Sequence, residues 1–316
     1  RQDDPGTFDT GDVYGSGGPT GVTFYENGAL GDKWSGTYLS CEASRNTVFG
    51  YQPRPKGATY SMDRFNFLST RNLSSNISEE ERDERVHFRP SDISIGPDGA
   101  IYVADWYDPG SGGHATRDES SSGAIYRIAP KGFKTVIPTL NLQSIDGQIE
   151  ALLSPEPNIR FLGFQALQKN GNKAYTAVIE LLNHKNPYLA ARAIWLLPYL
   201  GDAGIKKVQS LLKSKDAQYR LVAYRSLRRS GQNLIPHAKV LAKDKNAGVR
   251  RDVALSMRAY SAKQSNSVLL EVSKRYDGVD KNYVESIGLG AAGKEESFWS
   301  QLKNSMKMKD PLQWSS

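Results

Sequence analysis

The spacing of apolar and polar residues changes its period along the chain. In the first 134 residues, short or alternating apolar stretches are bounded by Gly, Pro, Asn and Asp, which is typical of β-strands joined by turns. Strands are predicted at residues 21–25, 37–41, 47–51, 64–68, 92–95, 100–104 and 124–128. Asp98-Gly99 separates two of these runs and supplies the residues that a tight hairpin turn requires. This part is therefore predicted to be all-β.

From about residue 145 the pattern becomes helical and repeats every 30 residues. The repeat is visible in one column that holds Pro157, Pro187, Ala217 and Ala247. Each of these opens a stretch in which apolar or small residues recur at i, i+4 and i+8, the pattern of one buried helical face. An earlier helix in each row is predicted to place Leu152, Leu182 and Leu212 in one core. Stacked helix pairs of this kind form a solenoid.

The repeat resembles HEAT repeats, whose second helix commonly begins with an acidic residue or Asn followed by Val-Arg. Arg160, Arg220 and Arg250 match that pattern, and Ala190 departs from it. In the family, this arginine usually makes a structural contact between repeats. The resemblance implies the same role for the three arginines here.

The strand-rich part suits a sandwich or a β-propeller. A propeller blade takes about 40–45 residues, so about three blades fit into this part. A propeller closes with 4–8 blades, so these blades are expected to stay open and the chain to be a fragment of a longer protein.

A further resemblance is carried by the stretch from Phe88-Arg89-Pro90 through Gly96-Pro97-Asp98-Gly99 to Asp105-Trp106, and by residues 18–25 and 34–46. They resemble quinoprotein sugar and sorbosone dehydrogenases. The order of elements resembles the membrane-bound dehydrogenase proteins, in which such a propeller precedes HEAT repeats and a c-type haem domain. The expected fold is thus the last blades of a six-bladed-type β-propeller in 1–134, a linker in 135–144, a HEAT-like α-helical solenoid in 145–306 and a tail in 307–316.

This resemblance implies an extracytoplasmic, periplasmic or secreted oxidoreductase-like protein that acts on a sugar or alcohol. It implies pyrroloquinoline quinone and calcium in the complete propeller, with Arg45 and Arg89 among the quinone contacts. Electrons would pass to haem c in a domain outside this chain. The catalytic base would lie in earlier blades. A single Arg89-Pro90 stands here in place of the Arg-x-Arg of glucose dehydrogenases.

A set of polar residues near the predicted strand ends forms a candidate ligand site: Glu42, Asn46, Asp105, Tyr107, Asp108, His114 and Asp118. Carboxylates and an imidazole on one loop suit a carbohydrate's hydroxyl groups, or a divalent cation, although the spacing indicates no metal site. The alternative is structural, because Asp favours turns and Gly-Ser-Gly-Gly forms a loop without further function.

Cysteine content and charge add two constraints. Cys41 is the only cysteine, which excludes an internal disulfide and a Cys-x-x-Cys-His haem attachment. Residues 1–134 carry a net charge of −5 and residues 135–316 carry +12. The basic solenoid is therefore expected to bind an acidic protein partner or the haem domain.

The alternative function is a non-catalytic carbohydrate- or protein-binding propeller with a basic HEAT scaffold for protein–protein interaction. Nucleic-acid binding is disfavoured, because the aromatic residues of the solenoid mostly occupy core columns instead of forming stacking platforms. No apolar run approaches the roughly 20 residues of a membrane-spanning helix.

The candidate ligand site gives a first prediction. In the full-length protein, His114→Ala and Asp105→Asn should weaken sugar binding or turnover, because the first removes an imidazole and the second removes the negative charge that strengthens a hydrogen bond. The thermal midpoint should stay nearly unchanged, and calorimetry with the sugar substrate measures both quantities. Unchanged sugar affinity in both variants would show that this loop does not bind the sugar.

Overall fold

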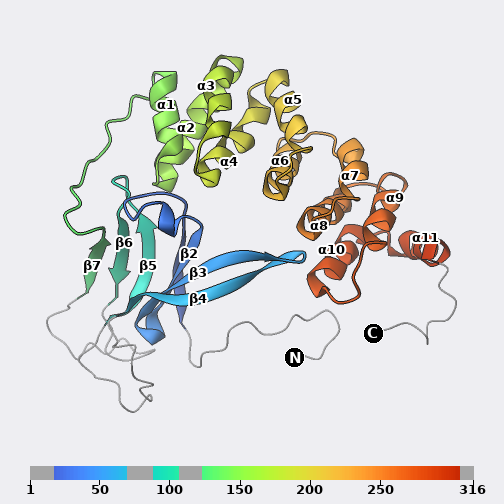
Figure 1. Cartoon of the computed structure of the whole chain (residues 1–316), viewed down its shortest axis with the longest axis horizontal. Helices are drawn as coiled ribbons and strands as arrows, with labels where there is room; N and C mark the ends of the chain where they lie inside the picture. The colour runs from blue at the N-terminus through green and yellow to red at the C-terminus, as the bar shows by residue number, and fades with distance from the viewer. Residues whose placement is uncertain (1–17, 70–87, 107–122, 307–316) are drawn as a thin grey trace, which may run out of the picture.

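The computed structural model describes residues 18–69, 88–106 and 123–306. A strand-rich part is followed by an arc of paired helices (Figure 1). The strands are β1 (Pro19–Tyr25), β2 (Thr37–Glu42), β3 (Thr47–Lys56), β4 (Thr59–Ser69), β5 (Pro90–Ile95), β6 (Ile101–Asp105) and β7 (Ala124–Ile128). The helices are α1 (Ile145–Leu153), α2 (Pro157–Asn170), α3 (Tyr175–Glu180), α4 (Pro187–Leu196), α5 (Asp202–Leu211), α6 (Ala217–Arg229), α7 (Ile235–Leu241), α8 (Ala247–Ser256), α9 (Ala262–Ser273), α10 (Lys281–Ala291) and α11 (Glu295–Met306).

The strands form two antiparallel sheets, one in the order β1-β2-β3-β4 and one in the order β5-β6-β7. Their first strands pack together, and a Cβ atom on Gly21 of β1 would lie 2.5 Å from the Cα atom of Asp92 in β5. Apolar side chains from both sheets share one core that includes Leu39, Val48 and Ile101. Within the described residues both sheets stay open. The strand-rich prediction is confirmed, and closure into a propeller is not shown.

Strands β3 and β4 form a much longer hairpin than the short strands predicted at 47–51 and 64–68. Pro53 and Pro55 argue against a strand, because proline lacks the N–H group that a sheet ladder needs. They are tolerated because Tyr51 is the last β3 residue paired with β2, so beyond it β3 pairs only with β4. The alternation of a hairpin with a two-residue turn directs the nitrogen atoms of both prolines away from β4. Gly57 opens that turn with a φ of 56°.

The helical part is built from stacked pairs. The second helices α2, α4, α6 and α8 begin 30 residues apart, and each has a side chain that caps its first turn. These helices form the inner layer of the arc, whereas α3, α5 and α7 form the outer layer (Figure 1). The predicted apolar stripe is buried: Leu167, Leu197, Leu227 and Met257 each have no exposed surface.

One core prediction was wrong in detail. Leu152 and Leu212 are buried, but Leu182 is only half-buried. A 3-10 turn, Leu181–Asn183, follows α3, and in it Leu181 takes the buried position instead. The core therefore continues from repeat to repeat. In the second repeat, Leu181 contributes to it in place of Leu182, its neighbour in the sequence.

The HEAT-type arginines have two kinds of contact. Arg220 binds Asp244 of the next repeat through two N–H groups, and Arg250 donates to the Tyr283 hydroxyl at 2.7 Å. Both also donate to backbone carbonyls of the turn before their own helix. Arg160 instead forms an ion pair with Glu26 of the strand-rich part at 2.8 Å. The structural role is thus found at Arg220 and Arg250, and at Arg160 the contact joins the two parts of the chain.

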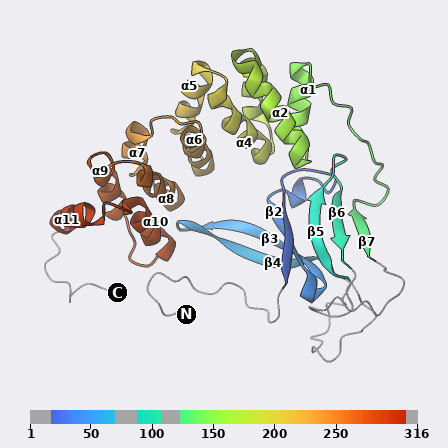
Figure 2. The same ribbon diagram turned by 180° about the vertical axis from the view of Figure 1, so that it is seen from behind.

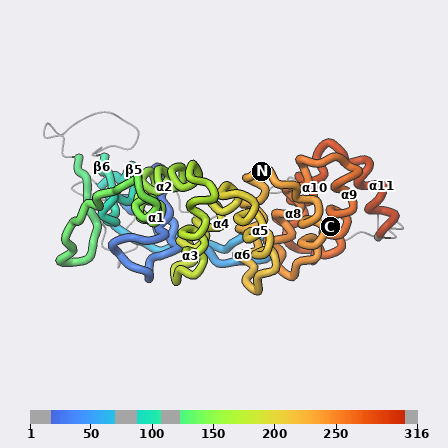
Figure 3. Tube along the Cα trace, turned by 90° about the horizontal axis from the view of Figure 1, so that it is seen from above, coloured from blue at the N-terminus to red at the C-terminus, as the bar shows by residue number. Residues whose placement is uncertain are grey.

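The β3–β4 hairpin runs from the sheets along the inner side of the arc toward α8 and α10 (Figures 1 and 2). Seen from above, it passes beneath α4 and α6 (Figure 3). The concave side of the solenoid is therefore covered in part by the chain's own hairpin. No helix among the described residues is both long and apolar enough to span a membrane.

The buried stripe gives a prediction for stability. Leu227→Ala should lower the free energy of unfolding by about 2–5 kcal/mol, because it leaves a cavity in the core of α6. Leu289→Ala, at a side chain that is 47% exposed, should change it by less than about 1 kcal/mol. Urea denaturation of both variants measures the difference. Equal effects would contradict the repeat core.

Candidate functional site

The structure brings together four of the residues that the sequence predicted for a ligand or quinone site. Arg89 donates its backbone N–H to Asp105 Oδ1 at 2.7 Å and its guanidinium Nη1–H to the carbonyl of Ala43 at 3.0 Å. Asn46 donates its side-chain amide to the carbonyl of Phe88 at 2.6 Å. Glu42 accepts from the backbone N–H groups of Gly18 and Ser44. The turn that follows β2 is thus joined to the start of β5, and the start of β5 to the end of β6.

These groups are placed by local backbone features. Glu42 caps the 3-10 turn Ala43–Arg45, and Asn46 ends that turn with a φ of 54°, a left-handed conformation that Asn tolerates. Glu42 is 1% exposed and Asn46 is 4% exposed. Arg45 lies in the same turn and is half-buried. Their contacts support the chain, and their role in ligand binding stays a prediction.

The other four predicted site residues, Tyr107, Asp108, His114 and Asp118, lie outside the described residues. In the part of the chain that the structure describes, no three His, Cys, Asp or Glu side chains are grouped so that they could hold a metal ion.

A buried ionic joint fixes the strand-rich part to the first repeats. Glu26, in the turn after β1, accepts from Arg192 Nη2 at 2.7 Å and from Arg160 Nη1 at 2.8 Å. Arg192 is 7% exposed and also donates to the carbonyls of Leu152 and Ser154. Burial lowers the pKa of Arg192 to about 10, and the neighbouring carboxylate of Glu26 opposes that shift. Removing one partner of such a joint leaves an uncompensated buried charge.

A second joint lies at the tip of the hairpin. The Ala58 N–H donates to Asp280 Oδ2 at 2.7 Å, and Arg251 donates to the Ala58 carbonyl. Ala58 is 1% exposed and belongs to the hydrophobic core of the helices. Gly57 lies so close to the same carboxylate that an added Cβ would come within 2.3 Å of Asp280 Oδ2. The tip of the hairpin is thus held by the last repeats, whereas the Glu26 joint holds the sheet from which the hairpin extends.

Between these two joints lies a cavity of about 500 Å³, which we call the hairpin cavity. It is lined by Phe24 and Tyr38 of the first sheet, by Pro53, Pro55, Tyr60 and Met62 of the hairpin, by Pro187, Tyr188, Ala191 and Ile194 of α4, and by Asp216, Gln218, Tyr219, Val222 and Arg225 of α6 and its cap. Its volume lies within the range of about 300–1,000 Å³ that is typical of ligand pockets.

The hairpin presents alternate residues to this cavity. Pro53 pairs with Met62 across the strands, and Pro55 pairs with Tyr60, so these four side chains share one face. Met62 is 50% exposed and Tyr60 is 37% exposed, so the cavity is open to solvent. From the other side, Phe24 packs against Tyr38 and Tyr188 with ring centroids 4.5 and 5.3 Å apart.

The polar groups of the cavity fall into two sets. Asp216 accepts from the Gln218 N–H as the cap of α6, and Arg225 is held by two hydrogen bonds to Asp252 at 2.6 and 2.8 Å. That carboxylate raises the pKa of Arg225, so its guanidinium stays charged. In contrast, the hydroxyls of Tyr38, Tyr188 and Tyr219 make no hydrogen bond to another described residue. Burial, together with Glu26 and the nearby tyrosines, raises the pKa of Tyr188, so its hydroxyl stays protonated.

The hairpin cavity was not predicted from the sequence. The sequence does indicate the hairpin's share of the lining, because Pro53 and Pro55 before Gly57, and Tyr60 and Met62 after it, are alternate residues. The contributions from α4 and α6 carry no local signal. They depend on the hairpin reaching across two repeats.

Comparison with known families divides the chain at the same place as the fold. A family described as a domain of unknown function (DUF7133) matches residues 9–132. HEAT repeats match residues 175–258. No curated protein matches the chain. The protein thus combines a strand-rich part with a helical solenoid that contains HEAT repeats.

The tip joint gives a prediction. Gly57→Ala should loosen the tip, because alanine in the left-handed region costs about 1–2 kcal/mol and its Cβ approaches Asp280. Trypsin cleavage after Lys56 should accelerate by about 5–30-fold. Gly132→Ala is the matched control, since Gly132 has a φ of 79° with nothing within 4 Å of the added Cβ. Equal cleavage after Lys56 in the wild type and both variants would mean that the tip is not held.

Proposed function

We propose that this protein is a non-catalytic binding module that takes an extended, proline-containing segment of a partner protein in the hairpin cavity. The observation that carries the proposal is the convergence of five aromatic side chains from three parts of the chain on one open cavity. Phe24 and Tyr38 come from the first sheet, Tyr60 from the hairpin, and Tyr188 and Tyr219 from the helices. The HEAT repeats support protein interaction in general.

The chemistry of the lining favours a polyproline II segment. Such a segment presents proline rings and unpaired backbone carbonyls, and aromatic-lined grooves recognise it by ring packing and a few hydrogen bonds. The hydroxyls of Tyr38, Tyr188 and Tyr219 are donors for those carbonyls. A preformed polyproline helix also loses little conformational entropy on binding.

A carbohydrate suits the hairpin cavity less well. A sugar needs several side chains that are free to bind its hydroxyl groups, and a site that recognises it leaves those groups open. Here Asp216 caps a helix and Arg225 is held by Asp252. The cavity therefore offers ring faces and hydroxyls more than open carboxylate or guanidinium groups.

A redox function of the sugar-dehydrogenase type is the second candidate. It is favoured by the close packing of β1 against β5, because the first strands of neighbouring propeller blades approach each other in this way around the axis. We infer that the two sheets are such neighbours. The same reading suggests a carbohydrate ligand near Asp105, a haem c partner domain and a periplasmic or secreted setting.

The residues proposed to hold pyrroloquinoline quinone do not fit that group well. These residues are Arg45 and Arg89: Arg89 donates its Nη1–H to the carbonyl of Ala43, and Arg45 is half-buried in the 3-10 turn Ala43–Arg45. A quinone's carboxylates need cationic groups that are open to them. We therefore assign no chemical step to a quinone or to calcium in this chain.

The proposed function is tested with a fluorescein-labelled decaproline peptide in a fluorescence-anisotropy titration. Wild-type protein should bind the peptide. Tyr60→Ala and Tyr219→Ala should each weaken binding by about tenfold or more, a loss of about 1.4 kcal/mol, because each removes a ring from the cavity. Tyr219→Phe keeps the ring and removes only the hydroxyl, so its loss should be smaller.

Trp299→Ala is the matched control, because Trp299 on α11 is 38% exposed, like Tyr38, and lies outside the cavity. It should bind decaproline as the wild type does. The proposal is wrong if decaproline does not bind, or if the cavity variants bind it equally well. It is also wrong if a linear glucose hexasaccharide competes for the cavity as strongly as the peptide.

A further inference from the structure

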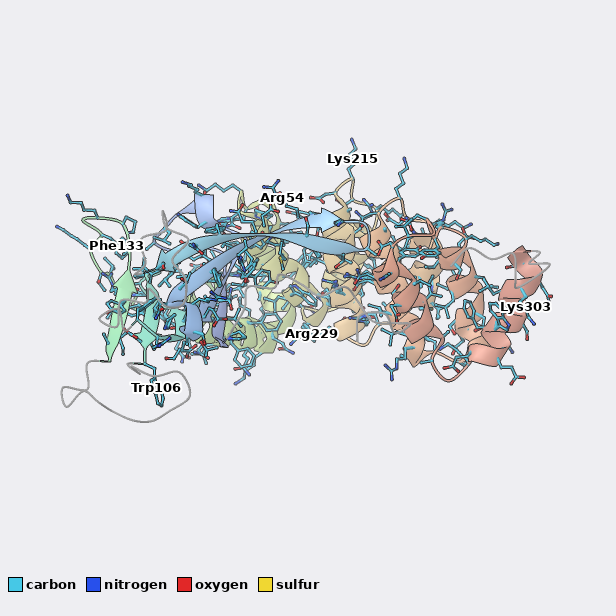
Figure 4. All side chains as sticks on the ribbon, turned by 90° about the horizontal axis from the view of Figure 1, so that it is seen from below. Arg54, Trp106, Phe133, Lys215, Arg229 and Lys303 are labelled. Carbon is cyan, nitrogen blue, oxygen red and sulfur yellow. The ribbon has the colours of Figure 1, made fainter. Side chains whose placement is uncertain are left out.

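The positive charge of the protein is concentrated in two middle repeats. Residues 202–246 carry eleven Lys/Arg against three Asp/Glu, a net charge of +8, whereas the whole chain carries +7. Arg220 and Arg225 are paired with Asp244 and Asp252. Of the other nine cations, eight are exposed. Lys215 projects from one edge of the solenoid (Figure 4), and the guanidinium of Arg229 lies 5.9 Å from the centroid of the Trp195 ring. The exposed surface of these repeats is therefore strongly positive.

The outer layer of the same repeats contains a groove of about 390 Å³ between α5 and α7. Lys206 and Lys213 line it, and both are exposed. Its floor includes Leu212 and Leu241, which are 8% and 4% exposed. Burial lowers the pKa of His237 in the groove, so the imidazole is neutral near pH 7 and the lysines supply the charge. We call this feature the outer groove.

Val240 makes the outer groove different from the corresponding surface of the earlier repeats. It lines the groove and is 70% exposed. The 30-residue register places Glu150, Glu180 and Ser210 at the equivalent positions, and all three are exposed polar residues. An apolar side chain thus replaces a polar one where the surrounding charge is most positive.

We propose that the outer groove docks an acidic amphipathic helix from a partner protein. A helix laid in a groove presents apolar residues at i, i+3 and i+4 toward it and acidic residues to either side. Val240 and the leucine floor would pack against the apolar residues, and Lys206 and Lys213 would face the acidic ones. Charge complementarity of this kind also accelerates association.

Other polyanions match the outer groove less well. Single-stranded nucleic acid uses aromatic side chains as stacking platforms, and no Phe, Trp or Tyr lines this groove. A polyanion without an apolar face would gain nothing from Val240. Helices α5 and α7, whose residues line the outer groove, lie on the convex side of the arc, whereas the hairpin lies on the concave side (Figure 1). Docking there is therefore independent of the hairpin cavity and of the function proposed for it.

The test uses a fluorescein-labelled peptide of about 16 residues, long enough to form a helix, with Leu at every third or fourth position and Glu elsewhere. Anisotropy should report binding to the wild-type protein. Val240→Glu, which restores the residue type of Glu150 and Glu180, should weaken binding by about tenfold or more. The double variant Lys206→Gln with Lys213→Gln should do the same. The matched control is Lys173→Gln with Lys263→Gln, two exposed lysines outside the groove, and it should bind within about twofold of the wild type.

Two comparison probes, poly-glutamate of the same length and oligothymidylate, decide the class of partner. The proposal predicts that both bind at least about tenfold more weakly than the amphipathic peptide, because neither places an apolar side chain on Val240. It is overturned if either probe binds as tightly, or if Val240→Glu binds the peptide as the wild type does. It is equally overturned if the peptide does not bind the wild type. Thermal midpoints of the variants show that each is folded, which is expected because all the substituted side chains are exposed.

Discussion

The contact between the hairpin tip and the last repeats determines how the strand-rich part lies against the solenoid. Ala58 is buried among the helices, its N–H is bound by Asp280 and its carbonyl by Arg251. A two-stranded hairpin is marginally stable by itself, so its extended shape depends on such support. Without the tip contact, Tyr60 and Met62 would not lie opposite α4 and α6. The hairpin cavity would then lose the wall that the hairpin forms.

The sheet from which the hairpin extends is fixed to the first repeats by a charged joint. Glu26 satisfies Arg160 and Arg192, which come from two successive repeats, so the first sheet is aligned with the solenoid before the hairpin extends from it. The hairpin that these joints hold in place also makes the two sides of the solenoid different. Because the hairpin covers part of the concave side, the outer groove that we propose as a docking surface lies away from it, between α5 and α7.

The sequence predicts local elements well and contacts between distant segments poorly. Seven strands and the 30-residue helix pairs follow from apolar periodicity, because each element depends on its own residues and on one neighbour. The length of the hairpin was not predicted, because Pro53 and Pro55 argue against a strand. They are tolerated because this part of β3 pairs with β4 alone and not with β2. The convergence of Glu42 and Asn46 with Arg89 was readable from strand pairing. The hairpin cavity was not, because Tyr188 and Tyr219 meet Tyr60 only through tertiary docking.

Hydrogen exchange at the amide of Ala58 measures whether the tip of the hairpin is docked on the helices. A docked tip, with this N–H bound to Asp280 and 1% of the residue exposed, predicts that the amide exchanges as slowly as those in the core of α8. Exchange at the rate of an unprotected turn, while α8 stays protected, would show that the hairpin does not dock. The hairpin cavity would then not exist in solution.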